Sequence, residues 1–390
     1  MSNRIFRSHR TLVARAIPSP QGHASSRPCC AVGTEYHLLS ALFAPRPQPR
    51  RLISAAAELI AAAASSCPTA AARGVVSSSA IENFAQSQAR PAVSSAGVLF
   101  RSISVRMAST DAAAKVEAAK DLAAKRAVAE HFSPSFKWVG IGSGTTILYV
   151  INEIKRVLGD DVTNTLFVPT GYQSRSAIVA AGLVPVAFDT LPDNVVLDVA
   201  FDGADEVDDE LNCIKGGGAC LFQEKLVAER ARKFVCVADY RKLQPRLLAN
   251  WPTIPIEVAP IATQAVLHAL IKLGSTAPKV RAGLLAKTGP LKTDQDFFII
   301  DAPFAQPLLT SSDVAAGKGK GDGSDGTWEV SALSSAIKAI TGVLEVGLFC
   351  GVDGITAFAE KKGTACGGQK PVAVYFGMQD GSVEVRARKE

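Results

Sequence analysis

The chain has 390 residues, enough for two ordinary domains, and its 47% hydrophobic and 20% charged residues are typical of a soluble globular protein. The net charge of +6 is concentrated at one end: residues 1–106 hold twelve Arg, three Glu and no Lys or Asp, a charge of +9. The remainder therefore carries 6 − 9 = −3, so the basic character belongs to the first 106 residues and gives no indication of nucleic-acid binding by the folded part, for which we expect no nucleic-acid partner. The eight cysteines are scattered without zinc-site spacing and indicate a reduced compartment.

Residues 1–106 are rich in Arg, Ser, Ala and Pro, a composition typical of organellar transit peptides. The apolar stretch from Leu52 to Ala64 is short for a membrane span and contains Glu58, so we expect no membrane partner. We interpret 1–106 as a disordered or targeting extension, or as a translated upstream region with little function. Met107 is a candidate start site. We expect a cytoplasmic protein, or a mitochondrial one if the extension is a targeting signal.

From Lys137 onward, short apolar strands alternate with helical patterns, which predicts an α/β fold with a parallel sheet. The predicted strands are Trp138–Ile141, Thr165–Val168, Val195–Phe201 and Phe234–Val237. The predicted helices in this part are Thr146–Leu158, Tyr172–Ala181 and Cys220–Ala231.

Around Trp251 the pattern changes. The runs IPIEVAP and FFIIDAPF, with helices at Thr263–Leu273 and Ser331–Ile340, predict a smaller α/β unit. A run rich in Gly, Ser, Lys and Asp, residues 311–326, interrupts this unit and is predicted to be a flexible surface insertion. The expected domains are 107–251 together with 346–390 for the larger one, and 252–345 for the smaller one.

The run from Gly140 to Thr146 (GIGSGTT) follows an apolar strand and opens a helix. Backbone N–H groups at a helix N-terminus favour an anion, and the hydroxyls of Ser143, Thr145 and Thr146 add donors. The run lacks the last glycine of a dinucleotide fingerprint and the lysine of a P-loop. It is therefore either a site for a phosphate monoester or a plain tight turn.

The acidic run Asp202-Gly203-Ala204-Asp205-Glu206 directly follows an apolar strand. Ligands of open α/β sheets bind beyond the carboxyl ends of the strands, which is where this run falls. The alternative is an ordinary Asp/Gly turn. Beyond Glu206 and Asp208, no residue stands at metal-ligand spacing, so we expect no metal and no cofactor.

Lys215-Gly216-Gly217-Gly218 leads into the helix that carries Glu224. Three glycines in a row are costly to order and are tolerated where backbone approaches a ligand. Lys215 could then stabilise an oxyanion and Glu224 could act as a base, with Lys215 and Lys225 keeping it ionised near neutral pH; the alternative is a surface glutamate. Lys242 follows the strand of KFVCVADYRK and suits a phosphate, or is simply a surface lysine.

These segments together resemble the A-type ribose-5-phosphate isomerase family in its fungal form. The resemblance rests on GIGSGT, DGADEVD, KGGGACLFQEK and CVADYRK in this order and spacing, and on FVPTGYQSR at 167–175 and GVLEVGLF at 342–349. It covers about residues 112–390 and does not include the N-terminal extension. Thr293-Asp294-Gln295-Asp296 departs from the family's usual T-D-N-G-N, which puts the lid or dimer geometry of the smaller domain in doubt.

The resemblance implies a Rossmann-like domain with a smaller ferredoxin-like α/β domain inserted near the C-terminus. It also implies interconversion of D-ribose 5-phosphate and D-ribulose 5-phosphate in the pentose phosphate pathway, and a homodimer or homotetramer. The implied catalytic residues are Glu224 as base, Asp202 and Asp205 for sugar hydroxyls and ring opening, and Lys215 for the enediolate. The implied substrate-binding residues are Ser143, Gly144, Thr145, Thr146, Gly203, Ala204, Gly216, Gly217, Gly218, Lys242 and Lys120.

Two other readings stay open at this point. Related folds bind sugar phosphates as regulators without turning them over, although such sensors usually carry a DNA-binding helical domain that has no counterpart here. A hexosamine-phosphate deaminase or a CoA-transferase relative is the alternative among enzymes. Lys215 followed by Glu224 nine residues later favours the pentose isomerase.

Overall fold

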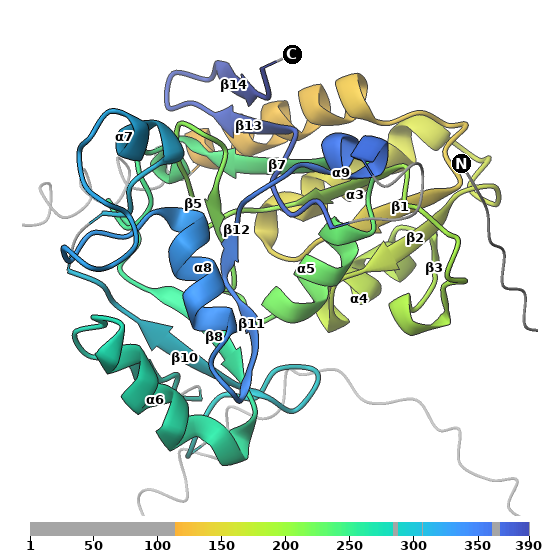
Figure 1. The fold of residues 1–390 in the computed structure, drawn as a ribbon. Coiled ribbons are helices and arrows are strands. Elements are labelled where there is room, and N and C mark those ends of the chain that lie inside the picture. The colour runs from red at the N-terminus through yellow and green to blue at the C-terminus, as the bar shows by residue number, and fades with distance from the viewer. Residues whose placement is uncertain (1–113, 284–287, 306, 361–366, 390) are drawn as a thin grey trace, which may run out of the picture. The chain divides into compact units, whose positions relative to one another are not determined.

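The computed structural model describes residues 114–283, 288–305, 307–360 and 367–389, so the extension 1–106 and Met107 lie outside the described residues. The described elements form one large sheet, one small antiparallel sheet and a three-stranded sheet, with helices packed on the first two (Figure 1). In these residues we find no helix with the length and apolar character needed to span a membrane.

The large sheet has seven strands in the order β14-β13-β7-β4-β1-β2-β3. All neighbouring pairs are parallel except β13 with β14, which confirms the predicted α/β fold with a mainly parallel sheet. The strands are β1 (Trp138–Ile141), β2 (Leu166–Pro169), β3 (Val184–Pro185), β4 (Val199–Asp202), β7 (Phe234–Asp239), β13 (Ala373–Gly377) and β14 (Val383–Ala387).

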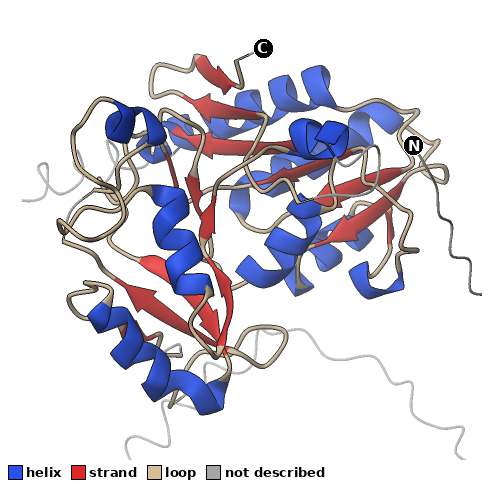
Figure 2. Cartoon of the chain, viewed as in Figure 1, coloured by secondary structure: helices blue, strands red, loops and turns tan. Residues whose placement is uncertain are grey.

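Helices cover both faces of this sheet (Figure 2). Strand β7 is buried over its whole length because its side chains alternate between two cores, as expected for a parallel strand covered on both sides. One core includes side chains from the helix at 114–131, from α3 and from α4, and the other includes side chains from α5. These helices are α3 (Thr145–Leu158), α4 (Tyr172–Ala180) and α5 (Leu221–Glu229); α9 (Gly354–Glu360) follows later in the chain.

Helix α3 shows why the sequence folds this way at the site. Its buried side chains include Ile147, Val150, Ile151 and Ile154, spaced three or four residues apart, so they form one apolar stripe against the sheet. The helix begins directly after Gly144, which has φ 102°, and ends at Gly159, which has φ 60°. The first glycine thus fixes the N-terminus of α3 next to the end of β1.

The smaller unit is a four-stranded antiparallel sheet in the order β11-β8-β10-β9, covered by α6 and α8 around its own core. Its elements are β8 (Ile254–Val258), α6 (Thr263–Lys272), β9 (Lys279–Val280), β10 (Phe298–Ala302), α8 (Val330–Lys338) and β11 (Val343–Val346). The three-stranded sheet contains β12 (Leu348–Phe349), β6 (Cys213–Ile214) and β5 (Glu206–Val207). Short 3-10 helices are η1 (Phe188–Thr190), η2 (Tyr240–Lys242) and η3 (Pro260–Ala262).

Residues 311–326, predicted to be a flexible insertion, contain helix α7 (Ser311–Ala315). Thr310 and Asp313 form a capping box at its start. The Asp313 carboxylate also accepts two hydrogen bonds from Arg246, of 2.6 and 2.8 Å, and one from Lys318 of 2.7 Å. These contacts fasten the beginning of the insertion to Arg246, while its flexibility stays a prediction.

Candidate active site

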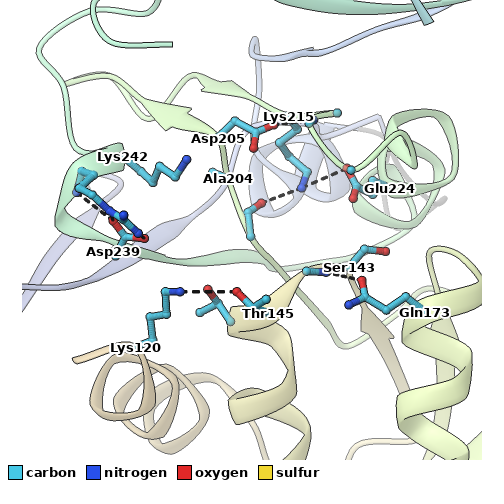
Figure 3. Close-up of a pocket in the computed structure, with 17 residues that line it drawn as sticks. Lys120, Ser143, Thr145, Gln173, Ala204, Asp205, Lys215, Glu224, Asp239 and Lys242 are labelled. Carbon is cyan, nitrogen blue, oxygen red and sulfur yellow. Dashed lines mark hydrogen bonds and ion pairs between the residues drawn. The ribbon is translucent and has the colours of Figure 1, made fainter. Parts of the chain in front are cut away.

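A cavity of about 330 Å³ lies where strands β1, β4 and β7 end. All the site residues predicted from the sequence except Asp202 line it, and Asp202 contacts the lining residue Lys215. The lining residues are Lys120, Ser143, Gly144, Thr145, Thr146, Gln173, Gly203, Ala204, Asp205, Lys215, Gly216, Gly217, Gly218, Glu224, Asp239, Arg241 and Lys242 (Figure 3). The four sequence segments therefore converge, as expected for carboxyl ends of parallel strands.

The loop after β1 is held in place by backbone contacts to its neighbours. A Cβ atom on Gly142 would lie 1.9 Å from Oδ1 of Asp202, so only glycine fits there. The same Oδ1 accepts the N–H of Ser143 at 3.1 Å, and the Oε1 of Gln173 accepts the N–H of Gly144 at 2.9 Å. The first turn of α3 contains no acidic residue, so the positive end of its dipole faces the cavity uncompensated.

One end of the cavity gathers positive charge around this helix start. Lys120, which is buried, lies 3.5 Å from the hydroxyl of Thr145 (Figure 3). Lys242 extends over the ring of Trp251, 4.7 Å from its centroid. Arg241 is also present, but the two hydrogen bonds of its guanidinium group, of 2.6 and 2.9 Å, go to the carboxylate of Asp239. Two lysines and a helix N-terminus make this end suited to a phosphate group.

The other end holds a buried cluster of one lysine and two carboxylates. The Nζ of Lys215 lies 2.9 Å from Oδ2 of Asp202 and 3.2 Å from Oε2 of Glu224, and it donates to the carbonyl of Gly203 at 2.6 Å. The side chains of Lys215 and Glu224 are only 3% and 6% exposed. Lys215 is the partner of both carboxylate oxygens, and each oxygen has a further lone pair that can accept a hydrogen bond from a substrate hydroxyl.

One lysine compensates only one of the two carboxylates. Burial, together with the negative charge of Asp202, raises the pKa of Glu224 to about 8 against the opposing charge of Lys215. Burial also raises the pKa of Asp202, while Lys215 works against this shift. Burial alone would lower the pKa of Lys215, but the charges of Asp202 and Glu224 outweigh it and raise that pKa. The charge balance therefore favours one protonated carboxylate beside a charged lysine.

Part of the expectation for Glu224 is wrong. Lys225 does not support its charge, because the Nζ of Lys225 bonds to Glu345 at 3.0 Å and to the carbonyls of Val346 and Leu348, at 2.5 and 2.9 Å. Lys215 does favour the ionised form of Glu224, as expected, but burial and the charge of Asp202 outweigh it and raise the pKa of that carboxyl. Adjacent residues on a helix point in different directions, so Lys225 does not face the same neighbours as Glu224.

Asp205 and the glycine run form one wall of the cavity. The N–H of Gly217 donates to Oδ2 of Asp205 at 2.7 Å, and a Cβ atom on Gly217 would lie 2.7 Å from the Asp205 carboxylate. Gly216 has φ 105°, and a Cβ atom there would lie 2.7 Å from Leu221. Gly216 therefore requires glycine, and a side chain on Gly217 would displace the carboxylate of Asp205.

The remaining acids of the DGADEVD run support the backbone. Glu206 accepts the N–H groups of Leu248, Asn250 and Trp251 at 2.5, 2.6 and 2.9 Å. Asp208 accepts three hydrogen bonds within its own loop. Across the described ranges, no group of three or more His, Cys, Asp or Glu side chains is placed to hold a metal ion.

Three lining residues had no predicted role: Gln173, Asp239 and Arg241. They belong to two segments, FVPTGYQSR and CVADYRK, on which the resemblance to the family partly rests. Gln173 lies in the first turn of α4, the helix that follows β2. Its contact with Gly144, at the start of α3, exists only because β1 and β2 are neighbours in the sheet. A polar residue one turn into a helix carries no sequence signal of its own.

Residues 166–363 match the model of the family described as ribose 5-phosphate isomerase A (phosphoriboisomerase A). The chain is also 43% identical over 272 residues to the ribose-5-phosphate isomerase of Mycosarcoma maydis, a match that covers 70% of this chain and 81% of the relative. This chain belongs to the ribose 5-phosphate isomerase A family.

Two solved structures of ribose 5-phosphate isomerases resemble the chain over 70% of its length and 99% of theirs. The enzyme from Methanocaldococcus jannaschii has a TM-score of 0.54 and 28% identity. The other, a D-ribose-5-phosphate isomerase in complex with phospho-erythronic acid, has a TM-score of 0.55 and 29% identity. The fold of the family thus accounts for the described part of this chain.

The cationic end of the cavity gives a binding prediction. Lys242→Ala should weaken binding of inorganic phosphate about ten- to a hundredfold, because a charge-assisted hydrogen bond to a phosphate is worth roughly 1.5–3 kcal/mol. Titration calorimetry measures the Kd. Lys272→Ala, which removes an exposed lysine at the end of α6, is the matched control and should leave the Kd unchanged. An unchanged Kd in Lys242→Ala would remove Lys242 from the phosphate site.

Proposed function

We infer that this protein interconverts D-ribose 5-phosphate and D-ribulose 5-phosphate, the activity after which its family is named. The observation that supports this conclusion is the arrangement of the cavity. The buried cluster of Glu224, Lys215 and Asp202 lies at one end, and the other end carries lysines that suit an anion. A sugar phosphate has the same two ends: a phosphate on C5 and the carbon atoms C1 and C2 that react.

We propose that the phosphate is bound by the start of α3, through Ser143, Gly144, Thr145 and Thr146, and by Lys120 and Lys242. This orientation is supported by the helix N-terminus and by the placement of both lysines at the same end of the cavity (Figure 3). It directs C1 and C2 of the open-chain sugar toward the carboxylates. Gly203 and Ala204 would line the path between the two ends.

We propose Glu224 as the base. It removes the proton from C2 of the aldose, so that a C1–C2 double bond forms and the electrons of the C1 carbonyl move to O1. A proton then passes from the C2 hydroxyl to O1, and Glu224 returns its proton to C1, which gives the ketose with its carbonyl at C2. No hydride, water or redox partner enters this balance. A carboxylate with a raised pKa suits both proton transfers, because Glu224 must accept a proton from C2 and then release it to C1.

We propose that Asp202 and Asp205 handle the sugar hydroxyls and assist ring opening, since ribose 5-phosphate is mostly cyclic. Asp202 is supported by its place beside Lys215, whose Nζ lies 2.9 Å from Oδ2, and by its raised pKa, which burial causes. Lys215, whose pKa is raised by Asp202 and Glu224 in spite of its burial, keeps the positive charge that stabilises the enediolate oxygen. The backbone N–H groups of Gly216, Gly217 and Gly218 complete this site in the proposal.

For the domains, we propose a Rossmann-like domain made of 107–251 and 346–390, with a ferredoxin-like domain at 252–345 that serves as lid or dimerisation surface. Support comes from the strand order β11-β8-β10-β9 with α6 and α8 in the two crossovers, which is the βαββαβ arrangement. The family resemblance is the basis for proposing a homodimer or homotetramer. It is also the basis for a cytoplasmic location, or a mitochondrial one if 1–106 is a targeting signal.

The activity is tested directly with purified protein in a coupled assay. We expect turnover of ribose 5-phosphate, and none of glucosamine 6-phosphate or an acyl-CoA, which represent the alternative enzymes. Turnover should survive exhaustive treatment with a chelator, because proton transfer by Glu224 with Lys215 requires no Lewis acid. Loss of most activity that a divalent ion restores would contradict the metal-free mechanism, and binding of ribose 5-phosphate without turnover would favour a regulator.

The role of Glu224 is tested by Glu224→Gln, which keeps the shape of the side chain but cannot accept the proton. Turnover should fall by about two to four orders of magnitude, and exchange of the C2 proton with deuterated water should disappear with it. Folding and substrate affinity should change little. Glu229→Gln, at the far end of the same helix, is the matched control. If Glu224→Gln exchanges the C2 proton at nearly the wild-type rate, Asp202 or Asp205 is the base.

The pKa of Glu224 also determines how the rate depends on pH. Burial and the charge of Asp202 raise this pKa to about 8, and kcat/KM reports the ionisation of the free enzyme. Below that pKa the ionised fraction falls about tenfold per pH unit, so kcat/KM for ribose 5-phosphate should rise between about pH 7 and pH 8 and then level off. The substrate phosphate, with a pKa near 6, is already ionised in this range. A constant kcat/KM over this range would contradict the assignment.

A further inference from the structure

Arg281, which directly follows β9 in the smaller unit, reaches the glycine run of the active site. Its Nη1 donates to the carbonyl of Gly216 at 2.9 Å and to that of Gly217 at 3.1 Å. The two residues lie 65 and 64 positions earlier in the chain. The Arg281 side chain is only 17% exposed, so this is a largely buried contact between the smaller unit and the catalytic loop.

Arg281 is itself held in a fixed orientation. Its Nε and Nη2 donate to the two carboxylate oxygens of Asp301 on β10, at 2.8 and 2.5 Å. Such a bidentate pair fixes the plane of the guanidinium group as well as its position. Because Asp301 takes Nε and Nη2, the remaining Nη1 is the group that faces the two glycine carbonyls.

This contact determines where the N–H groups of the loop point. A trans peptide is planar, so its N–H points opposite to its C=O. The peptide that joins Gly216 to Gly217 directs its carbonyl at Arg281 and its N–H at Asp205, which lines the cavity. The next peptide likewise directs its carbonyl at Arg281, so the N–H of Gly218 points to the same side. In the described part of the chain, this N–H has no hydrogen-bond partner.

The space in front of Gly218 is also open. A Cβ atom on Gly218 would meet no atom within 4 Å, and Gly218 lines the cavity beside Lys215 and Glu224. The loop lies at the start of α5, whose first residues add the positive end of a helix dipole. An unpaired N–H next to a charged lysine and a base is the arrangement that an oxyanion requires.

We propose that Arg281 is a positioning residue, which holds the peptides of Gly216–Gly218 with their N–H groups toward the cavity as an oxyanion site for the enediolate. The inference rests on the proposed isomerisation. Three glycines in succession have many accessible conformations, so the loop needs an external restraint to keep one of them. Hydrogen bonds from a charged guanidinium to the carbonyls also polarise these peptides and strengthen their N–H groups as donors.

Arg281→Met tests the proposal, because it removes the donors and keeps much of the side-chain volume. We expect kcat for ribose 5-phosphate to fall at least tenfold, toward the roughly 10²–10³-fold loss seen when one oxyanion donor is removed. The Kd of phospho-erythronic acid, whose carboxylate resembles the planar anionic enediolate, should rise as well. The KM for ribose 5-phosphate and the Kd of inorganic phosphate should stay nearly constant, since the phosphate end does not touch Arg281.

Arg246→Met is the matched control. It removes another bidentate pair, with Asp313 at 2.6 and 2.8 Å, that does not contact the glycine run. We expect its kcat and all ligand affinities to equal those of the wild type. If Arg281→Met does not fold, Arg281→Lys replaces it. The lysine ammonium group keeps a positive charge for Asp301 but cannot bind Asp301 and the glycine carbonyls at the same time as a planar guanidinium does. The same selective fall in kcat is expected.

The outcomes separate the inference from the proposed function. A folded Arg281 variant with unchanged kcat and unchanged affinity for phospho-erythronic acid would overturn the positioning role. A general loss that includes the Kd of inorganic phosphate would overturn it too, because it would indicate distortion of the whole site. Wild-type protein that fails to isomerise ribose 5-phosphate would instead contradict the proposed function itself.

Discussion

The site depends on a buried lysine that faces two carboxylates. Lys215 lies within 3.2 Å of both Asp202 and Glu224, and burial of such a group is tolerated only if its charge is compensated. The single positive charge compensates one carboxylate, so the charge balance favours protonation of the second. Moving Lys215 away would leave two buried carboxylates without a counter-charge, so the proposed chemistry and the stability of the cluster depend on the same contact.

Bringing these groups together requires the backbone to pack very closely. A Cβ atom on Gly142 would lie 1.9 Å from Asp202, and one on Gly347 would lie 2.3 Å from the carbonyl of Lys215. Gly347 accepts the N–H of Lys215 at 2.9 Å and donates to the carbonyl of Pro255 at 2.7 Å. The chain thus passes from β11 to β12 at a position where only glycine fits. The two hydrogen bonds of Gly347 connect the backbone of Lys215 to the smaller sheet.

The sequence predicted the parts of the site that follow from strand ends. Segments after β1, β4 and β7 had to meet at one edge of a parallel sheet, and the predicted helices α3 to α5 are observed within one or two residues of their ends. What it could not predict are contacts made by tertiary packing. Arg281 reaches Gly216 across 65 residues, and its sequence context contains no recognisable pattern. The direction of Lys225 was missed for the same reason, because spacing along a helix does not tell which neighbour a side chain finds.

The large sheet and the smaller unit contact different parts of the cavity. The proposed phosphate contacts all come from segments around the large sheet: Lys120, the start of α3 and Lys242. The smaller unit instead contacts segments near Glu224, the proposed base. Arg281 bonds to Gly216, and Asp294 and Gln295 bond to Tyr172 and Gln223 at 2.7 and 2.8 Å. A change in the position of the smaller unit would therefore alter the geometry around C1 and C2 while leaving phosphate binding intact. Because Asp294 and Gln295 make these contacts, the departure of 293–296 from the family's usual pattern lies at the contact of the smaller unit with the loops of the large sheet and not at the proposed phosphate site.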